Sequence, residues 1–217
     1  FLGAEASKKA QEATNQSIEG MNYFRNVAEA KKNVAFEQAK GNLFEYIEAA
    51  KFNKNAAFAG SKLHAVVTDS VGRPHDAADI EITRNGSVVR QVQAKFSDSQ
   101  KAAADSVTMH RKDKYAGMQR LIRKEENYTD TRTGEKTSLL KRAKGLAEER
   151  ANKEGTLYQK QYRDVADNLT DELNHGGVSS GGTTVEEVRR AYDNPDNYAK
   201  SFERKQVAAE MKTTATN

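Results

Sequence analysis

Cysteine is absent from this chain of 217 residues, which excludes disulfide bonds, thiolate catalysis and zinc sites built on thiolates. Long apolar runs are absent too. No stretch approaches the roughly 18 residues that cross a membrane, and no basic segment followed by an apolar one indicates a signal peptide. We therefore expect no membrane partner. The first residue is Phe1 rather than methionine, which is compatible with a longer protein upstream.

Hydrophobic residues are scarce for a chain of this length. They make up 36% of the sequence against 30% charged residues, and the mean hydropathy is −0.87. Part of the chain should therefore form exposed helices rather than core. The net charge is +4, which is compatible with a nucleic-acid partner without being diagnostic of one. The stretch from Lys40 to Arg123 holds 14 Lys and Arg against 9 Asp and Glu, so it carries a basic excess.

The pattern divides the chain into three segments. Residues 1–40 predict a helical arm whose sparse apolar positions include a narrow stripe of Met21, Phe24, Val27 and Ala28. Residues 41–124 predict a core of helices and strands, and residues 125–217 predict a mainly helical region. Within the last segment, we expect the glycine-rich residues 176–182 to form a flexible linker. Thr183 or Thr184 should cap a short helix, and Pro195 should begin the last one.

The core segment predicts a small sheet between two helices. Three strands are expected between an amphipathic helix and a second helix, and that second helix takes its apolar face from Tyr115, Met118, Leu121 and Ile122. Because so few short strands cannot bury a face alone, the helices must cover the sheet. The expected fold class is α/β (α+β): a small mixed β-sheet flanked by helices, with additional helical segments at both ends. In chain order, we expect these core elements at 42–59 (helix), 63–69, 79–84 and 88–96 (strands) and 99–124 (helix).

The second and third strands should form a hairpin, because Asn85-Gly86 is the strongest short-range signal for a two-residue turn. Side chains alternate across a strand, so each strand has one polar and one apolar face. The polar side chains Asp79, Gln93 and Lys95 then converge at one end of the hairpin.

These three residue types suit phosphodiester hydrolysis. Carboxylate and amide oxygens are ligands that Mg²⁺ accepts, and a bound metal lowers the pKa of a water molecule. A nearby lysine can stabilise the negative charge that grows in the transition state or orient the attacking water. Asp79 would supply only one carboxylate to the metal, so a further acid is expected. Glu45, on the helix before the sheet, is the candidate.

Asp79 followed by Gln93-x-Lys95, with helical Glu45 before them, resembles the PD-(D/E)XK superfamily of restriction-endonuclease-like nucleases. The Gln-x-Lys element is similar to that of its Mrr-like members. The resemblance implies that Glu45 is the acid of the N-terminal helix, Asp79 the central metal ligand, Gln93 an amide variant of the second ligand and Lys95 the catalytic lysine.

The resemblance covers roughly residues 41–123 and implies a restriction-endonuclease-like core. It places that fold's second helix over 114–122. The sequence departs from the family pattern at Ala78, where many members have proline. The terminal segments are not explained by it.

The implied activity is that of a metal-dependent endonuclease using Mg²⁺ or Mn²⁺. DNA is the favoured substrate, and RNA stays open. The setting would be restriction or defence, or a toxin domain whose partner is an immunity protein; the action would be cytoplasmic, with secretion or delivery of a toxin left open. A homodimer is compatible with a site that cuts one strand.

A second hypothesis belongs to another class. In a non-catalytic helical module that binds protein or DNA, the hairpin would be scaffold, and the apolar-poor residues 1–40 and 138–174 would await a partner. Other chemical signals are weak. The histidines show no pair at i, i+4, so we expect no zinc site, and the glycine run is not a P-loop because no lysine follows it. The scattered histidines are His64, His75, His110 and His175.

Overall fold

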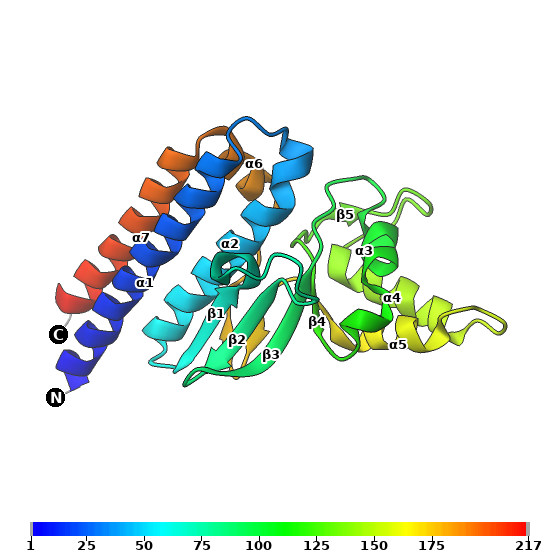
Figure 1. The fold of residues 1–217 in the computed structure, drawn as a ribbon, viewed down its shortest axis with the longest axis horizontal. Helices are drawn as coiled ribbons and strands as arrows, with labels where there is room; N and C mark the ends of the chain where they lie inside the picture. The colour runs from blue at the N-terminus through cyan, green and yellow to red at the C-terminus, as the bar shows by residue number, and fades with distance from the viewer. Residues whose placement is uncertain (1, 216–217) are drawn as a thin grey trace.

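The computed structural model describes residues 2–215, which form seven α-helices and a five-stranded mixed sheet (Figure 1). The mixed α/β class and the small mixed sheet expected from the sequence are confirmed. The helices are α1 (Leu2–Ala30), α2 (Phe36–Phe58), α3 (Ala102–His110), α4 (Leu139–Asn152), α5 (Gln159–Asn168), α6 (Val185–Asp193) and α7 (Pro195–Ala215). The sheet strands are β1 (Leu63–Val67), β2 (Ile80–Arg84), β3 (Ser87–Ala94), β4 (Gln119–Leu121) and β7 (Leu169–Thr170). Two short ladders pair β5 (Tyr128–Thr129) with β6 (Lys136–Thr137), and β8 (Asn174–His175) with β9 (Val178–Ser179).

The sheet follows the order β1-β2-β3-β4-β7. The first three strands are antiparallel, whereas β4 and β7 run parallel to β3. The β2–β3 hairpin turns at Asn85 and Gly86, whose φ values of 51° and 81° are those of a mirror-image turn, so the expected hairpin is confirmed. Parallel strands need a longer crossover, which α3 supplies between β3 and β4.

The expected helix over 99–124 is wrong beyond its first half. α3 ends at His110, a short 3₁₀ turn covers Asp113–Tyr115, and Gln119–Leu121 is a strand. All three residues of β4 are buried, because a parallel strand inside the sheet is covered on both faces. The apolar spacing that suggested a helical face therefore came from a buried strand. The second helix that the family resemblance places over 114–122 is likewise not there.

The main hydrophobic core lies between α2 and the sheet. Phe44, Ile47 and Phe52 of α2 pack in one cluster with Ile80 and Val92 of the strands. The narrow stripe expected on the N-terminal arm is also buried in this cluster, because α1 lies along α2 and α7 lies along α1 (Figure 1). The stripe consists of Met21, Phe24, Val27 and Ala28.

A second core joins α3, α4 and α5 on the other side of the sheet (Figure 1). Ile122 and Leu169, next to and within the parallel strands, belong to it, whereas neighbouring Leu121 belongs to the first core. The sheet thus separates two helical layers, and the α3–α5 layer forms a lobe beside the end of β3. No helix within residues 2–215 is both long and apolar enough to span a membrane.

The glycine-rich stretch expected to be a linker is a folded hairpin. Gly176 and Gly177 form the turn between β8 and β9, and their φ values of 56° and 80° explain the choice of glycine. Ser180 and Thr183 are buried against α2, where both donate hydrogen bonds to the fully buried Glu48.

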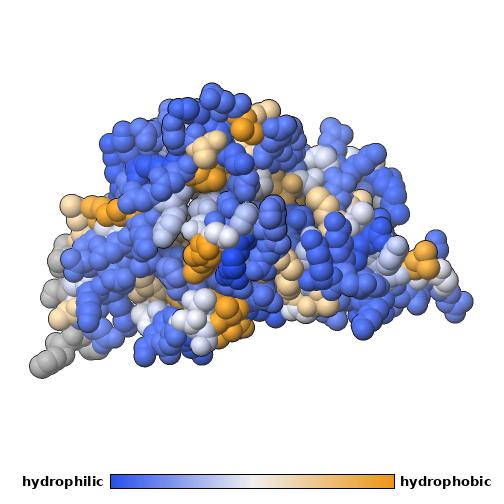
Figure 2. Space-filling view, viewed as in Figure 1, coloured by the Kyte–Doolittle hydropathy of each residue, from blue (hydrophilic) through white to orange (hydrophobic). Residues whose placement is uncertain are grey.

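The two expected helix starts after this hairpin are confirmed. Thr184 caps α6 by accepting a hydrogen bond from the Glu187 backbone, and Pro195 begins α7. Around these elements the surface is mostly hydrophilic, and its apolar residues are scattered (Figure 2). This accords with the low hydrophobic content of the chain.

Candidate active site

Asp79 is held at the centre of the three antiparallel strands. It directly precedes β2, where its backbone N–H donates to Val92 O and its carbonyl accepts from Thr68 N, each at 2.9 Å. The pairing of Ile80 with Val92 places Asp79 opposite Gln93. A bulge between Ile82 and Thr83 lies further along, so it leaves this register intact.

The Asp79 carboxylate is oriented by two donors from β3. Its Oδ2 accepts a hydrogen bond from the Ala94 backbone N–H at 2.9 Å and another from the Gln93 side-chain amide. Gln93 is almost fully buried, and its Nε2 also lies 3.3 Å from Ala94 O. The expected convergence of Asp79 and Gln93 is confirmed. In this rotamer, the Gln93 amide directs its nitrogen to Asp79 and its oxygen away from it.

Lys95 follows β3 and is fixed through its backbone. Its N–H donates to Leu121 O of β4 at 2.9 Å, so the residue lies where the antiparallel and parallel parts of the sheet meet. The side chain is half-buried, with Nζ 5.8 Å from the centroid of the Tyr115 ring. Its positive charge opposes the rise in the pKa values of both Asp79 and Glu45, so the ammonium lies within electrostatic range of both carboxyls.

Glu45 projects from α2 toward the same point and is half-buried. Burial raises its pKa well above the ordinary value, and the negative charge of Asp79 raises it further. Burial also raises the pKa of Asp79, although Lys95 and the Ala94 N–H oppose the shift. Two carboxyls in one buried site resist ionising together unless a cation lies between them. The pair is therefore suited electrostatically to a divalent ion.

The four residues singled out from the sequence are thus brought into one neighbourhood from α2, β2 and β3. Their potential donor set is two carboxylates and one amide oxygen, all hard ligands. Within residues 2–215, no group of three or more His, Cys, Asp or Glu side chains is arranged to hold a metal ion. Any metal at this site would therefore depend on the amide oxygen of Gln93, on water and on substrate.

The polar face of the hairpin continues beyond the site. Glu81 pairs across the strands with Gln91, at 3.5 Å between side chains, and accepts a charged hydrogen bond from Arg73. A cavity of about 470 Å³ lies over this pair, bounded on its other side by the Gly117 loop. An open space thus adjoins the Asp79 site along the same face.

Two basic residues near the site do not face solvent. Arg120 is 1% exposed, donates to Met118 O and pairs with Asp164. Arg123 is also buried and donates to Ser97 O and to Glu125. They lie in or beside β4 rather than on a helix surface, so they stabilise the sheet and its lobe.

Sequence reasoning missed the surroundings of Lys95. Lys114 lowers the pKa of Asp79 electrostatically, and its Nζ lies 5.1 Å from the Tyr115 ring, so this ring has Lys95 and Lys114 beside it. Behind them, His110 is fully buried, and burial lowers its pKa well below the ordinary value. The signal was hidden because residues 110–115 read as the middle of a helix.

Comparisons of the chain with protein-family models, with curated proteins and with solved structures found no match.

Proposed function

We propose that this chain is a metal-dependent nuclease that hydrolyses phosphodiester bonds of DNA. The observation that carries the proposal is the convergence of Glu45, Asp79, Gln93 and Lys95, which are supplied by a helix and two strands. The order of elements supports it as well, since α2, three antiparallel strands, α3 and a parallel strand surround these side chains. A restriction-endonuclease-like core is part of the same proposal.

Mg²⁺ or Mn²⁺ would be held by Asp79, Glu45 and the amide oxygen of Gln93. When bound, the ion would polarise the phosphate and lower the pKa of a water. Asp79 is already oriented for this role by the Ala94 N–H. The Gln93 amide would have to turn over, because its nitrogen now points to Asp79.

Lys95 would act on the phosphate itself. Its ammonium lies within electrostatic range of both carboxyls, from where it would stabilise the charge that develops on the phosphate oxygens or orient the attacking water. The fixed Lys95 backbone keeps this charge at the sheet end without reorganisation.

The test is incubation of plasmid DNA with the protein in Mg²⁺, in Mn²⁺ and in EDTA. We expect cleavage only with metal, and we expect Asp79→Asn and Lys95→Ala to lower it by about 10²-fold or more, as the loss of a transition-state contact does. Glu186→Gln and Lys200→Ala change exposed residues of α6 and α7 and serve as charge-matched controls. Variants that fold like the parent and cleave as fast would refute the site.

One observation favours a second candidate, a non-catalytic binding module. Gln93 Nε2 already satisfies Asp79 through a hydrogen bond, as it would in a hairpin that serves only as scaffold. Absence of cleavage of DNA and of RNA under either metal would favour this candidate. Assays with both substrates also decide between DNA and RNA for the first one.

The biological setting is part of the proposal. A restriction or defence enzyme and a toxin domain both use such an activity. A toxin would be neutralised by an immunity protein, and co-expression with the neighbouring gene would reveal one. A homodimer would let two sites cut both strands, which sedimentation with duplex DNA can test.

A further inference from the structure

The positive charge of the chain is concentrated in one part of it. Residues 101–168, which end with α5, contain 16 Lys and Arg against 11 Asp and Glu, whereas the remainder contains 19 against 20. The whole net charge of +4 therefore arises in the segment that builds β4 and the α3–α5 lobe. The rest of the chain, which includes the long α1 and α7, is slightly acidic.

Cations flank α3 at both ends and form a row past the helix, which itself carries no Lys or Arg. Lys101 precedes the first turn of this helix, and Arg111 and Lys112 follow its last turn. Nine helical residues span about 13 Å, close to the axial rise of roughly four nucleotides of one DNA strand. Lys114 continues the row and acts electrostatically on Asp79. The row thus ends at the residue proposed to bind metal.

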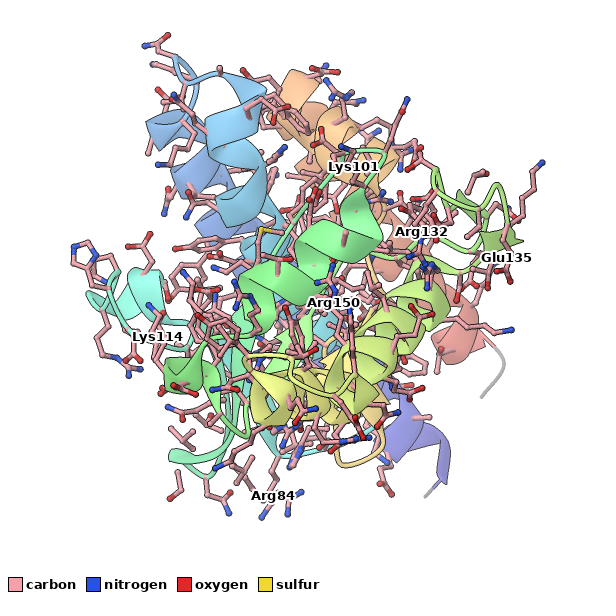
Figure 3. The ribbon with its side chains drawn as sticks, turned by 90° about the vertical axis from the view of Figure 1, so that its right-hand side faces the viewer. Arg84, Lys101, Lys114, Arg132, Glu135 and Arg150 are labelled. Carbon is pink, nitrogen blue, oxygen red and sulfur yellow. The ribbon has the colours of Figure 1, made fainter. Side chains whose placement is uncertain are left out.

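A cavity widens this row on the side of α4. Its volume is about 380 Å³, and its lining includes Lys101, Arg132, Arg142 and Arg150 together with the single acid Asp130. Asp130 forms an ion pair with Arg142. Figure 3 shows Lys101, Arg132, Arg150 and Lys114 on the side of the molecule that carries α3, α4 and α5.

Acids partly offset this charge: exposed Asp113 lies between Lys112 and Lys114 in the chain, and Glu149 lies near two arginines. Glu149 lies 3.4 Å from Arg142 and 3.8 Å from Arg132, measured between side-chain oxygen and nitrogen atoms. Both Arg132 and Glu149 are well exposed, so the pair is weak and open to exchange with another anion. Arg150 faces Thr108 at 3.4 Å instead of an acid.

We propose that this basic face binds the phosphate backbone of duplex DNA and leads one strand to the Asp79 site. The basic face is defined as Lys101, Arg111, Lys112, Lys114, Arg132 and Arg150. The choice of DNA rests on the proposed function; the surface itself rests on charge and geometry. It adds a contact region away from the reacting groups.

The aromatic residues of the lobe favour a duplex over a single strand. Single strands are held by rings on which bases stack. Here, the Arg111 guanidinium lies 4.2 Å from the ring centre of Tyr158, which is 48% exposed, and Tyr162 is buried, with Arg150 5.5 Å from its ring centre. An acidic protein partner would need an apolar centre to its interface. The residues of the basic face offer cations at its centre instead.

The test is fluorescence anisotropy with a labelled duplex DNA in EDTA, where no cleavage occurs, over a range of salt concentrations. Lys101→Ser with Arg132→Ser removes two exposed cations of the face. Each lost phosphate contact lowers the slope of log K against log salt by about 0.9, so we expect a loss of about 2 in slope and at least a tenfold loss of affinity near 0.1 M salt. Arg204→Ser with Lys205→Ser, on exposed positions of α7, is the matched control and should bind like the parent. Glu149→Gln should bind more tightly than the parent.

Several results would overturn the surface. One is an unchanged salt slope in the Lys101/Arg132 variant. Another is equal competition by polyglutamate at matched charge, and a third is tighter binding of duplex RNA than of DNA. Asp79→Asn should cleave nothing but keep the parent's salt slope. A parent that binds DNA through this face without cleaving it would refute the nuclease and keep the surface. Cleavage by the parent together with an unaltered salt slope in the Lys101/Arg132 variant would refute the surface and keep the nuclease.

Discussion

Lys95 Nζ lies 5.8 Å from the centre of the Tyr115 ring, and the ring is buried. Lys114 Nζ lies 5.1 Å and the Arg120 guanidinium 5.9 Å from the same ring centre. A tyrosine face attracts cations, and the attraction grows when water is excluded. Tyr115 is thus placed to hold Lys95 within electrostatic range of the two carboxyls.

The first prediction concerns this ring. Tyr115→Phe keeps the ring face and should keep most of the cleavage rate. Tyr115→Leu removes it, and a cation–ring attraction of about 1 kcal/mol corresponds to roughly a fivefold loss. The loss should fall on kcat rather than KM, because Lys95 acts after binding. Steady-state kinetics of both variants over a range of pH would check this; an equal loss in the Phe and Leu variants would show that the hydroxyl matters rather than the ring face.

The second prediction concerns the amide of the site. Gln93→Glu places a third carboxylate beside Asp79, so the apo protein should lose stability at neutral pH while its affinity for Mg²⁺ rises. Cleavage should be kept or increased. Thermal unfolding in EDTA and in Mg²⁺ measures both effects, because a ligand that binds the folded state raises its melting temperature. Gln93→Leu is the control and should lose the Mg²⁺ response. Loss of cleavage in the Glu variant despite tight Mg²⁺ binding would give Gln93 another role.

The third prediction follows from the raised pKa of Glu45. An acid whose pKa is higher in the folded protein than in the unfolded chain supports folding below its unfolded pKa, and this support is lost as the pH rises through the folded value. Glu45→Gln should therefore stabilise the apo protein at neutral pH and have little effect near pH 4. Melting curves in EDTA across this range would show it. Glu19→Gln, on an exposed position of α1, should be neutral at both pH values.

Metal binding gives the same pair a second pH dependence. Mg²⁺ must displace protons from carboxyls whose pKa values are raised, so its affinity should increase as the pH rises through them. Isothermal titration at several pH values would measure this. An affinity that does not change with pH would contradict metal binding at Glu45 and Asp79.

The fourth prediction separates folding from chemistry on α2. Glu48, one turn after Glu45, is fully buried and accepts hydrogen bonds from Ser180, Thr183 and the Leu173 backbone. Glu48→Ala leaves these donors unsatisfied, at a cost of about 3 kcal/mol in the free energy of unfolding. Urea unfolding against Glu37→Ala, which should change it by less than about 0.5 kcal/mol, would check this. A loss no larger than the control's would mean that the β8–β9 hairpin does not depend on Glu48.

Local signals in the sequence were enough for the hairpin and its polar face. Asn85-Gly86 specifies a turn by its own conformational preference, and alternation along the strands then brings Asp79 opposite Gln93. The stripe of Met21 and Phe24 was likewise visible, because a helix repeats its buried positions at a regular spacing.

Other features depended on contacts between distant segments. The three residues of β4 are too few to show a period, and their parallel pairing with β3 is formed across the α3 crossover. The charge of Arg120 suggests a surface position, but the side chain pairs with Asp164, 44 residues later in the chain. The glycines before α6 suggest a flexible linker in the sequence. Their hairpin is fixed by a hydrogen bond with Glu48, which lies more than 100 residues earlier.

The sequence by itself therefore determined the hairpin, its turn and the residues that could do chemistry there, because these follow from the backbone preferences of neighbouring residues. Only the tertiary structure decided that Glu45 joins Asp79 and Lys95, that Tyr115 lies beside the lysine, and that the basic excess gathers on one lobe. Those relationships arise from the packing of separate helices and strands around the sheet, and a linear pattern does not encode such distances directly.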